Sequence, residues 1–461
     1  MSGIRTASPV RRILPIIVLG ALILGWPAYW NGYPLVFGDT GNYIGQVKLR
    51  FIGWTAPPFY SAFVSATDFG LTLWGPMLAQ GLIAATVVVI ALEQFGLRRW
   101  WSLLAAFLAL AAFTGLPWLV SQVTADFFTG IAVLALALLA CGRLAPWHRR
   151  VLLPVTLLAI LAHQSHVPLA LGLVAAAGAI GWLLEGRRAG WLAVRRTAPA
   201  PAVALLLAVC VNAFGLGIPA LSPFGNIILA ARMLADGTAL DYLQKACPED
   251  DYRICDHLAE IPPEATVFLW DRPALWDALG GHRAWNTEAG RIIRGTVAQD
   301  PGGVLRALAA NGAGQFVALR TGESIRPWLR DDGPRPLIAR FYPREVPAFD
   351  QSRQQRGLLL ADVAPFERVH VPIAWLGIIG LLACLGLCRH DRMVLCLCAM
   401  VLLAAVGNAL LTGGLSEVQN RYAARLAWVL VLTPCLVVAA RMQESGGLQT
   451  PSATTTRRAG A

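Results

Sequence analysis

Charged residues are scarce in this chain of 461 residues. Asp, Glu, Lys and Arg make up 14% of the sequence, whereas hydrophobic residues make up 56%. Soluble globular domains carry about 25% charged residues and about 45–50% apolar ones. The shortage of charge therefore excludes an ordinary soluble protein and predicts an α-helical integral membrane protein.

Acidic residues are scarcest outside one segment, 218–368. That segment holds 19 of the 27 acidic residues and 17 of the 38 basic ones, which leaves eight acids and 21 bases for the rest of the chain. Basic residues that flank membrane spans report orientation. The net charge of +11 is therefore explained by topology, and we expect no binding to nucleic acid. The chain also lacks a Gly-Xaa-Ser-Xaa-Gly motif, so nothing supports acyl transfer through such a serine nucleophile.

Apolar runs near the length that crosses about 30 Å of hydrocarbon recur along the chain. The first run ends in WPAYWNGY with no small-residue cleavage site, so it predicts a retained span rather than a signal peptide. We expect about ten transmembrane helices, at roughly 13–30, 71–92, 100–117, 119–141, 151–163, 167–184, 200–220, 371–388, 393–412 and 425–440.

The basic residues predict the orientation of these spans. With the N-terminus in the cytoplasm, 17 of the 21 basic residues outside 218–368 fall inside, and only Lys48, Arg50, Arg421 and Arg425 fall outside. The positive-inside rule therefore predicts a protein of the bacterial inner membrane with both termini in the cytoplasm. This topology requires 151–184 to cross twice, as two short spans that meet at HQSHVP, where we expect the outer surface to dip toward the bilayer.

Four regions follow from the predicted spans. They are a seven-span N-terminal block (1–217), an extracytoplasmic domain (218–368), a three-span block (369–441) and a disordered cytoplasmic tail (442–461). The extracytoplasmic domain is predicted to be a small α+β unit, with a strand at EATVFLW (264–270). An oxidising periplasm favours a disulfide between Cys247 and Cys255, whereas the other seven cysteines lie in or beside spans as small apolar residues.

Two acids of the membrane part are candidate site residues. Asp39 begins GDTGNYI on the outer face, with Tyr43 four residues later, and its carboxylate could act as a general base toward a hydroxyl acceptor. The alternative is an N-cap in which Asp39 or Thr40 binds free N–H groups of a short helix. Asp126 is expected about two turns into the fourth span, where it either faces a functional cavity or makes a buried polar contact with Gln122 or Thr129.

Histidines and arginines complete the predicted outer-face site. His163 and His166 could bind phosphate, shuttle a proton or ligate a metal, or they could be held by backbone carbonyls. Arg421 and Arg425 are four residues apart before a span, a spacing that suits a phosphate or pyrophosphate. The alternative is an ion pair between Glu417 and Arg421, with Arg425 extending toward the membrane surface.

These features resemble the GT-C class of polyprenyl-phosphate-dependent glycosyltransferases. The resemblance rests on an acid in the first external loop, an outer-face site, the seven-span block and the Arg421–Tyr422 pair that opens a late span. The DTGNY, NRYAAR, FYSAF and HQSH segments also resemble a group of proteobacterial multi-pass membrane proteins. The resemblance implies that Asp39 is the base and that Arg421, with Arg425, binds the lipid-linked phosphate. GDTGNYI has one acid where many such enzymes have two, so Asp126 or the histidine pair would supply the missing group.

The sequence thus predicts a membrane enzyme that transfers a sugar from a polyprenyl-phosphate donor to an envelope acceptor. A transporter or flippase of a lipid-linked or anionic substrate would use the same arginines, and a non-catalytic envelope scaffold would need none of the site residues. Broken spans and an inverted repeat would indicate a transporter, and neither is evident in the sequence. The sequence neither requires nor excludes a divalent metal ion at Asp39 and Asp126. Besides the donor, the expected partners are membrane lipids.

Overall fold

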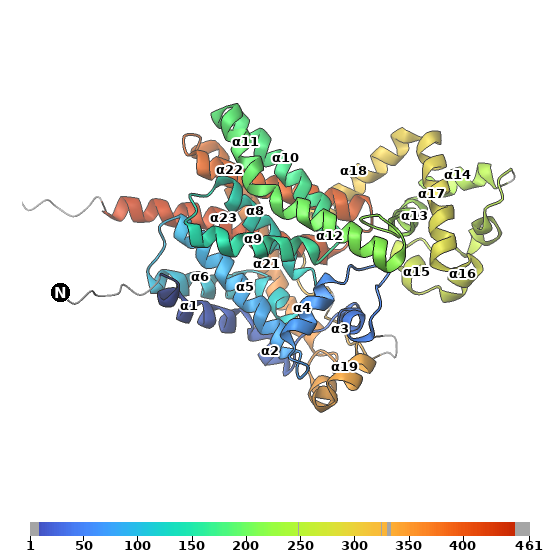
Figure 1. The fold of residues 1–461 in the computed structure, drawn as a ribbon, viewed down its shortest axis with the longest axis horizontal. Coiled ribbons are helices and arrows are strands. Elements are labelled where there is room, and N and C mark those ends of the chain that lie inside the picture. Colours follow the sequence, from blue (N-terminus) through green and yellow to red (C-terminus); the bar gives the residue numbers. More distant parts are fainter. Residues whose placement is uncertain (1–8, 248, 324, 330–332, 448–461) are drawn as a thin grey trace, which may run out of the picture.

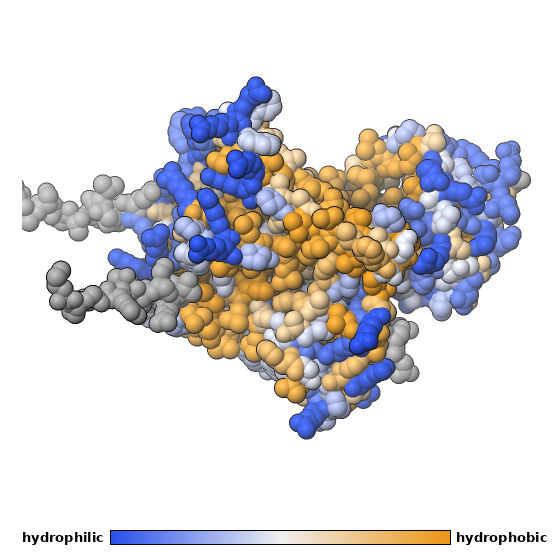
Figure 2. Space-filling model, viewed as in Figure 1, coloured by the Kyte–Doolittle hydropathy of each residue, from blue (hydrophilic) through white to orange (hydrophobic). Residues whose placement is uncertain are grey.

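The computed structural model describes residues 9–447 except 248, 324 and 330–332, and this part of the chain is helical (Figure 1). Within it the only β-type pairing is one isolated bridge, between Leu35 and Gln122. An apolar surface band separates two more hydrophilic ends of the molecule (Figure 2). The helical class and the membrane-protein character predicted from composition agree with this structure.

Six helices of the described residues are long and apolar enough to cross a membrane. Four more predicted spans correspond to shorter helices, α1 (Pro9–Leu24), α6 (Trp100–Phe113), α8 (Phe127–Cys141) and α9 (Pro146–Leu161). The count of ten spans therefore stays a prediction. The six long helices are α5 (Trp74–Gln94), α10 (His166–Glu185), α12 (Pro199–Leu216), α21 (Leu359–Leu387), α22 (Arg392–Ala409), which continues through the π-helical turn η3 (Leu410–Gly414), and α23 (Asn420–Gly447).

The predicted span 119–141 is interrupted. A short helix α7 (Leu116–Ser121) ends before an irregular stretch, and α8 begins only at Phe127. The free backbone groups of this stretch are bound by protein, because Val123 N donates to Leu35 O at 2.9 Å and Gln80 donates to Gln122 O at 2.9 Å. Irregular backbone at membrane depth is tolerated where protein covers it. Asp126 therefore lies at the start of a helix, and its predicted place two turns into a span was wrong.

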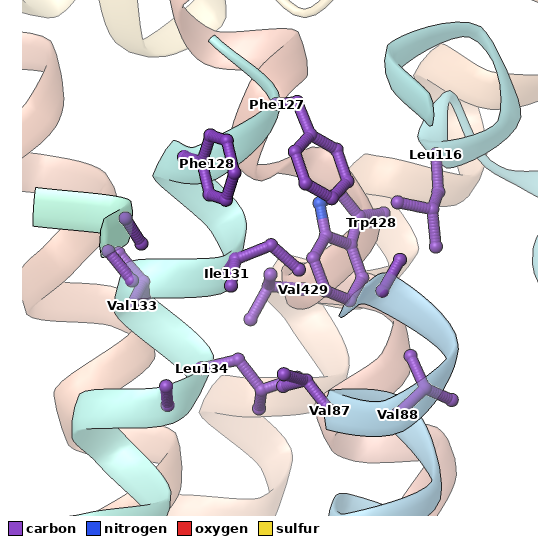
Figure 3. Packing of buried hydrophobic residues seen from close by; sticks show 14 of the residues in the cluster. Val87, Val88, Leu116, Phe127, Phe128, Ile131, Val133, Leu134, Trp428 and Val429 are labelled. Atoms are coloured by element: carbon purple, nitrogen blue, oxygen red, sulfur yellow. The ribbon is translucent and has the colours of Figure 1, made fainter. Parts of the chain in front are cut away.

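Helices α8 and α23 form the centre of the bundle. Trp428 and Val429 of α23 pack against Phe127, Ile131 and Leu134 of α8 (Figure 3). The predicted apolar cysteines Cys141 and Cys396 are joined in a disulfide where α8 and α22 lie side by side. Residues 442–447 of the predicted tail belong to α23, and 448–461 lie outside the described residues.

Residues 218–368, which the sequence predicts to be extracytoplasmic, are called the outer segment. It contains two helical parts. Helices α13–α18 share their own apolar core, which includes Phe268, Trp276 and Trp285. The strand predicted at EATVFLW is wrong, because 265–270 form helix α15, and Phe268 O accepts a hydrogen bond from Trp276 Nε1 instead of a strand partner. This part comprises α13 (Gly225–Ala235), α14 (Thr238–Ala246), the 3-10 helix η1 (Arg253–Glu260), α15 (Ala265–Trp270), α16 (Pro273–Ala278), α17 (Gly281–Gln299) and α18 (Pro301–Val317).

The second part of the outer segment packs against the connection between α1 and α5. It comprises α19 (Arg335–Phe341), η2 (Pro343–Glu345) and α20 (Val346–Gln351), and it lies against α3 (Thr40–Leu49). The buried Asp68 carboxylate, which follows α4 (Phe59–Thr67), pairs with Lys48 at 2.8 Å and accepts from Tyr342 at 2.6 Å. Asp68 is thus occupied in holding α3, α4 and this part together.

Other boundaries also differ from the sequence prediction. The outer segment was expected to extend to 368, but α21 already begins at Leu359. The basic loop expected at 187–196 is an amphipathic helix, α11 (Arg187–Thr197), which packs along α10. Cys247 and Cys255, at the end of α14 and in η1, are joined in a disulfide in the structure.

We predict that Gly377→Ala destabilises the bundle. A Cβ atom at Gly377 would lie 2.7 Å from the backbone oxygen of Leu430, so α21 and α23 would have to separate. Overpacking of this kind costs about 1–3 kcal/mol. Denaturant titration in detergent measures the loss in free energy of unfolding. The matched control is Gly172→Ala in α10, where a Cβ meets nothing within 4 Å. It should be neutral or stabilise by about 0.5–1 kcal/mol, and equal losses in both variants would contradict this packing.

Candidate functional site

A cavity of about 330 Å³ lies where the membrane helices meet the outer segment. Its walls come from α3, the turn between α9 and α10, α13, α15, η3 and the start of α23. Of the predicted site residues, the cavity wall includes Asp39, Tyr43, His163, Arg421 and Tyr422. Asp126, His166 and Arg425 do not line it.

Asp39 occupies the N-cap position of α3 but does not cap it. Its side chain makes no capping hydrogen bond, and Thr40 instead accepts from Phe37 N at 2.8 Å and donates to Val123 O at 2.9 Å. The N-cap alternative is thus wrong for Asp39. Within the described residues its carboxylate has no hydrogen-bond or ion-pair partner. Burial raises the pKa of Asp39, the positive charge of Arg421 lowers it, and the negative charge of Asp126 raises it.

Arg421 also lines the cavity and is fixed by several contacts. Its Nε donates to Gln419 Oε1 at 2.7 Å, its Nη2 donates to Tyr422 OH at 2.8 Å, and its Nη1 lies 3.6 Å from Asp126 Oδ2. The guanidinium also lies over the ring of Phe37, 4.4 Å from its centroid. These contacts orient a cation toward the cavity without neutralising it completely, because Asp126 is shared with a second arginine.

That second arginine, Arg425, is fully buried. Its Nη1 donates to Asp126 Oδ1 at 2.6 Å and its Nη2 donates to Asn408 Oδ1 at 2.7 Å. A buried charge that is both paired and hydrogen-bonded belongs to the scaffold of the bundle. Arg425 therefore neither extends to the membrane surface nor lines the cavity, and Asp126 acts as the counter-ion of two guanidiniums.

The two histidines have different surroundings. His166 Nδ1 donates to Ala159 O at 2.7 Å, so its Nε2 accepts from the Thr129 hydroxyl at 2.6 Å. Both ring nitrogens of His166 are used within the protein. This agrees with the alternative in which a backbone carbonyl holds the histidine. His163 accepts from Ser165 N through Nδ1 at 3.2 Å, and its ring lines the cavity. As predicted, α9 and α10 meet at this HQSH turn.

Glu417 lines the cavity and was not predicted as a site residue. It makes no ion pair with Arg421, and its carboxylate instead accepts from Gln419 Nε2 at 3.1 Å and from the hydroxyl of Thr266 in α15. Burial raises the pKa of Glu417, whereas the Gln419 hydrogen bond lowers it. Its signal in the sequence was that it is one of the eight acids outside the outer segment.

The outer segment adds an aromatic wall that the sequence did not indicate. Trp270, at the end of α15, lines the cavity with half of its surface exposed, and its ring lies 5.4 Å from that of Trp54. Trp54 belongs to the loop between α3 and α4 and also contacts Trp276 and His282. Trp270 is thus the aromatic side chain that the outer segment adds to the cavity wall, and Trp54 packs against it.

The sequence left open a divalent metal ion at Asp39 and Asp126. Asp126 is bound to both arginines, and in the described part of the chain no group of three or more His, Cys, Asp or Glu side chains is placed to hold a metal ion.

No protein-family model, curated protein or solved structure matches this chain.

We predict that Arg425→Met is strongly destabilising. It leaves Asp126 buried beside Arg421 alone, and removing one partner of a buried ion pair costs about 3–5 kcal/mol. Asp126→Leu should also destabilise, because it leaves Arg425 buried without a carboxylate. The double variant should lose less than the sum of the two single losses. Denaturant titration of the four proteins measures this coupling, and strictly additive losses would refute a direct pair.

Proposed function

We propose that this protein transfers a sugar from a polyprenyl-phosphate donor to a hydroxyl acceptor at the cavity, on the outer face of the membrane. The observation that carries the proposal is that Asp39 and Arg421 line the same cavity. An unpartnered carboxylate and a fixed guanidinium line one cavity at the end of a bundle of apolar helices. This combination suits transfer of a group away from a phosphate.

The proposed reaction is an inverting displacement. Asp39 accepts the proton of the acceptor hydroxyl, and the acceptor oxygen attacks the anomeric carbon of the donor. The bond between that carbon and the phosphate oxygen breaks, and the polyprenyl phosphate leaves with its electron pair. Arg421 stabilises the negative charge that develops on the leaving phosphate. Asp126 and Gln419 are positioning residues in this scheme, because they hold Arg421.

The surroundings of Arg421 support a lipid-linked donor. A second cavity, of about 40 Å³, reaches Arg421 from the side of α7, where Gly115 and Trp118 line it. An apolar groove of about 670 Å³ between α6 and α23 extends along the bundle to Thr114, next to Gly115. A polyprenyl chain in this groove would therefore direct its phosphate toward Arg421. The acceptor would occupy the cavity of about 330 Å³, against Trp270.

A donor panel tests the proposal. Purified protein in lipid is incubated with polyprenyl-phosphate sugars, and donor binding and slow donor hydrolysis are measured beside Arg421→Ala. Turnover of a donor that is lost in the variant supports a transferase. Binding without turnover, accompanied by movement of the donor between leaflets, would favour a flippase instead.

We predict that Asp39→Asn abolishes transfer while donor binding persists. An asparagine cannot accept the acceptor proton, and loss of a general base typically lowers the rate by about 10²–10⁴-fold. The control is Asp350→Asn, whose carboxylate pairs with Arg335 in the outer segment and does not line the cavity. Rates and donor affinity are measured for both variants, and full activity of Asp39→Asn would remove Asp39 from the mechanism.

The pH dependence of transfer should report the state of Asp39. Only the carboxylate form accepts a proton, so kcat/KM should rise with pH through the pKa of Asp39, which burial raises above its ordinary value. Asp126→Asn removes a negative charge that raises this pKa, so the rising limb should move to lower pH. Profiles of the wild type and this variant, compared with Asp350→Asn, measure the shift. If the rising limb of the kcat/KM profile does not move in Asp126→Asn, a group other than Asp39 titrates.

A further inference from the structure

A cluster of arginines lies at the end of the bundle remote from the cavity. Helices α9 and α10 meet beside the cavity at the HQSH turn, so Pro146 and Glu185 mark their opposite ends. Helix α11 begins next to Glu185 and returns along α10, with Gly190 so close that a Cβ there would lie 2.6 Å from Gly178 O. Hydrophilic residues surround this end of the molecule in Figure 2.

Arg149 of α9 and Arg196 of α11 belong to helices that both pack against α8 and α12, and their positive charges repel each other. Burial lowers the pKa of the Arg196 guanidinium, and the positive charge of Arg149 lowers it further. Within the described residues neither arginine has a hydrogen-bond or ion-pair partner. Folding therefore brings two like charges together without a protein counter-ion.

The acids at this end are already paired elsewhere. Glu93 binds His148 at 2.9 Å, Glu185 binds Arg392 at 3.4 Å, and Asp391 binds Arg441 at 3.2 Å. Among the acids at this end whose side chains the structure describes, none is therefore free to approach the arginine pair.

The start of α9 adds to the positive potential. Arg149 and Arg150 lie in the first turns of this helix of 16 residues, which begins at Pro146. Free N–H groups at a helix N-terminus carry partial positive charge and disfavour basic side chains. Arg149, Arg196 and the helix terminus would all be stabilised by one anion.

Apolar side chains beside the arginines indicate what carries that anion. Trp191 and Leu192 of α11 are 65% and 42% exposed, and they alternate with Arg188 and Arg195 along its outer face. Exposed tryptophan, leucine and arginine on one amphipathic helix are typical of the membrane interface. Basic clefts between helices at this level bind the head groups of anionic lipids.

We propose that Arg149 and Arg196 bind the phosphate of an anionic phospholipid in the leaflet at this end, with Trp191 and Leu192 against its glycerol and acyl region. The site lies away from the cavity and does not depend on the proposed transfer reaction. Bound lipid would join α11 to α9 by replacing the repulsion between Arg149 and Arg196 with two charge-assisted hydrogen bonds.

A lipid-dependent stability measurement tests this site. Full-length protein in zwitterionic detergent is heated with phosphatidylglycerol or with phosphatidylcholine of the same acyl chains. We expect phosphatidylglycerol to raise the Tm and phosphatidylcholine to leave it unchanged. In Arg149→Gln/Arg196→Gln the concentration of phosphatidylglycerol needed for the same shift should rise on the order of tenfold or more, since each arginine contributes roughly 1 kcal/mol.

The matched control is Arg294→Gln/Arg306→Gln, which removes the same charge from α17 and α18 and should respond to phosphatidylglycerol like the wild type. Without lipid, Arg149→Gln/Arg196→Gln should be at least as stable as the wild type, because it removes a repulsion. The proposal would be overturned if Arg149→Gln/Arg196→Gln were less stable than the wild type without lipid, or if both lipids raised the Tm of the wild type equally. It would also be overturned if the control variant lost as much of its response to phosphatidylglycerol as Arg149→Gln/Arg196→Gln. A full shift with inorganic phosphate alone would also overturn it in favour of a free-anion site.

Discussion

The buried contact between Arg425 and Asp126 is the interaction on which the rest of the site depends. It joins the first turns of α23 to the start of α8, and these two helices form the centre of the bundle. The break before α8 places Asp126 at a helix start, where its carboxylate accepts from Arg425. The second oxygen of the same carboxylate lies beside Arg421 and holds it at the cavity wall. One acid thus links the packing of the core to the electrostatics of the site.

The cavity is completed by a part of the chain that is distant in sequence from its charges. Asp39 and Arg421 come from the membrane part, whereas Thr266 and Trp270 come from α15 of the outer segment. Glu417 connects the two, because it follows η3 and its carboxylate binds Thr266. At the same level Glu323 accepts from the free backbone N–H of Arg421 at 2.8 Å, so the outer segment also supports the start of α23.

Much of the class and part of the site could be predicted from the sequence. Composition indicates a helical membrane protein, and charge placement directs attention to Asp39, His163 and Arg421, which the structure brings to one cavity. The roles of Asp126, His166 and Arg425 were assigned less well, because residue type does not reveal which buried charges neutralise one another. EATVFLW reads as a strand from its β-branched and aromatic residues, but its neighbours offer a helical core and no strand to pair with. Helix breaks such as 122–126 depend on tertiary hydrogen bonds that no local pattern records.

The division of the cavity between two stretches of chain affects how this protein can diversify. The two charges of the proposed reaction, Asp39 and Arg421, belong to the membrane part, and Arg421 lies beside the buried pair of Asp126 and Arg425. The aromatic wall and Thr266 belong to a separately packed unit that contributes no part of that pair. Substitutions in that unit can change the shape of the cavity wall without altering Asp39, Asp126 or Arg421. Under the proposed function, acceptor selectivity and the transfer chemistry thus lie on different segments of the chain, and a new acceptor could be accommodated without a change at Asp39 or Arg421.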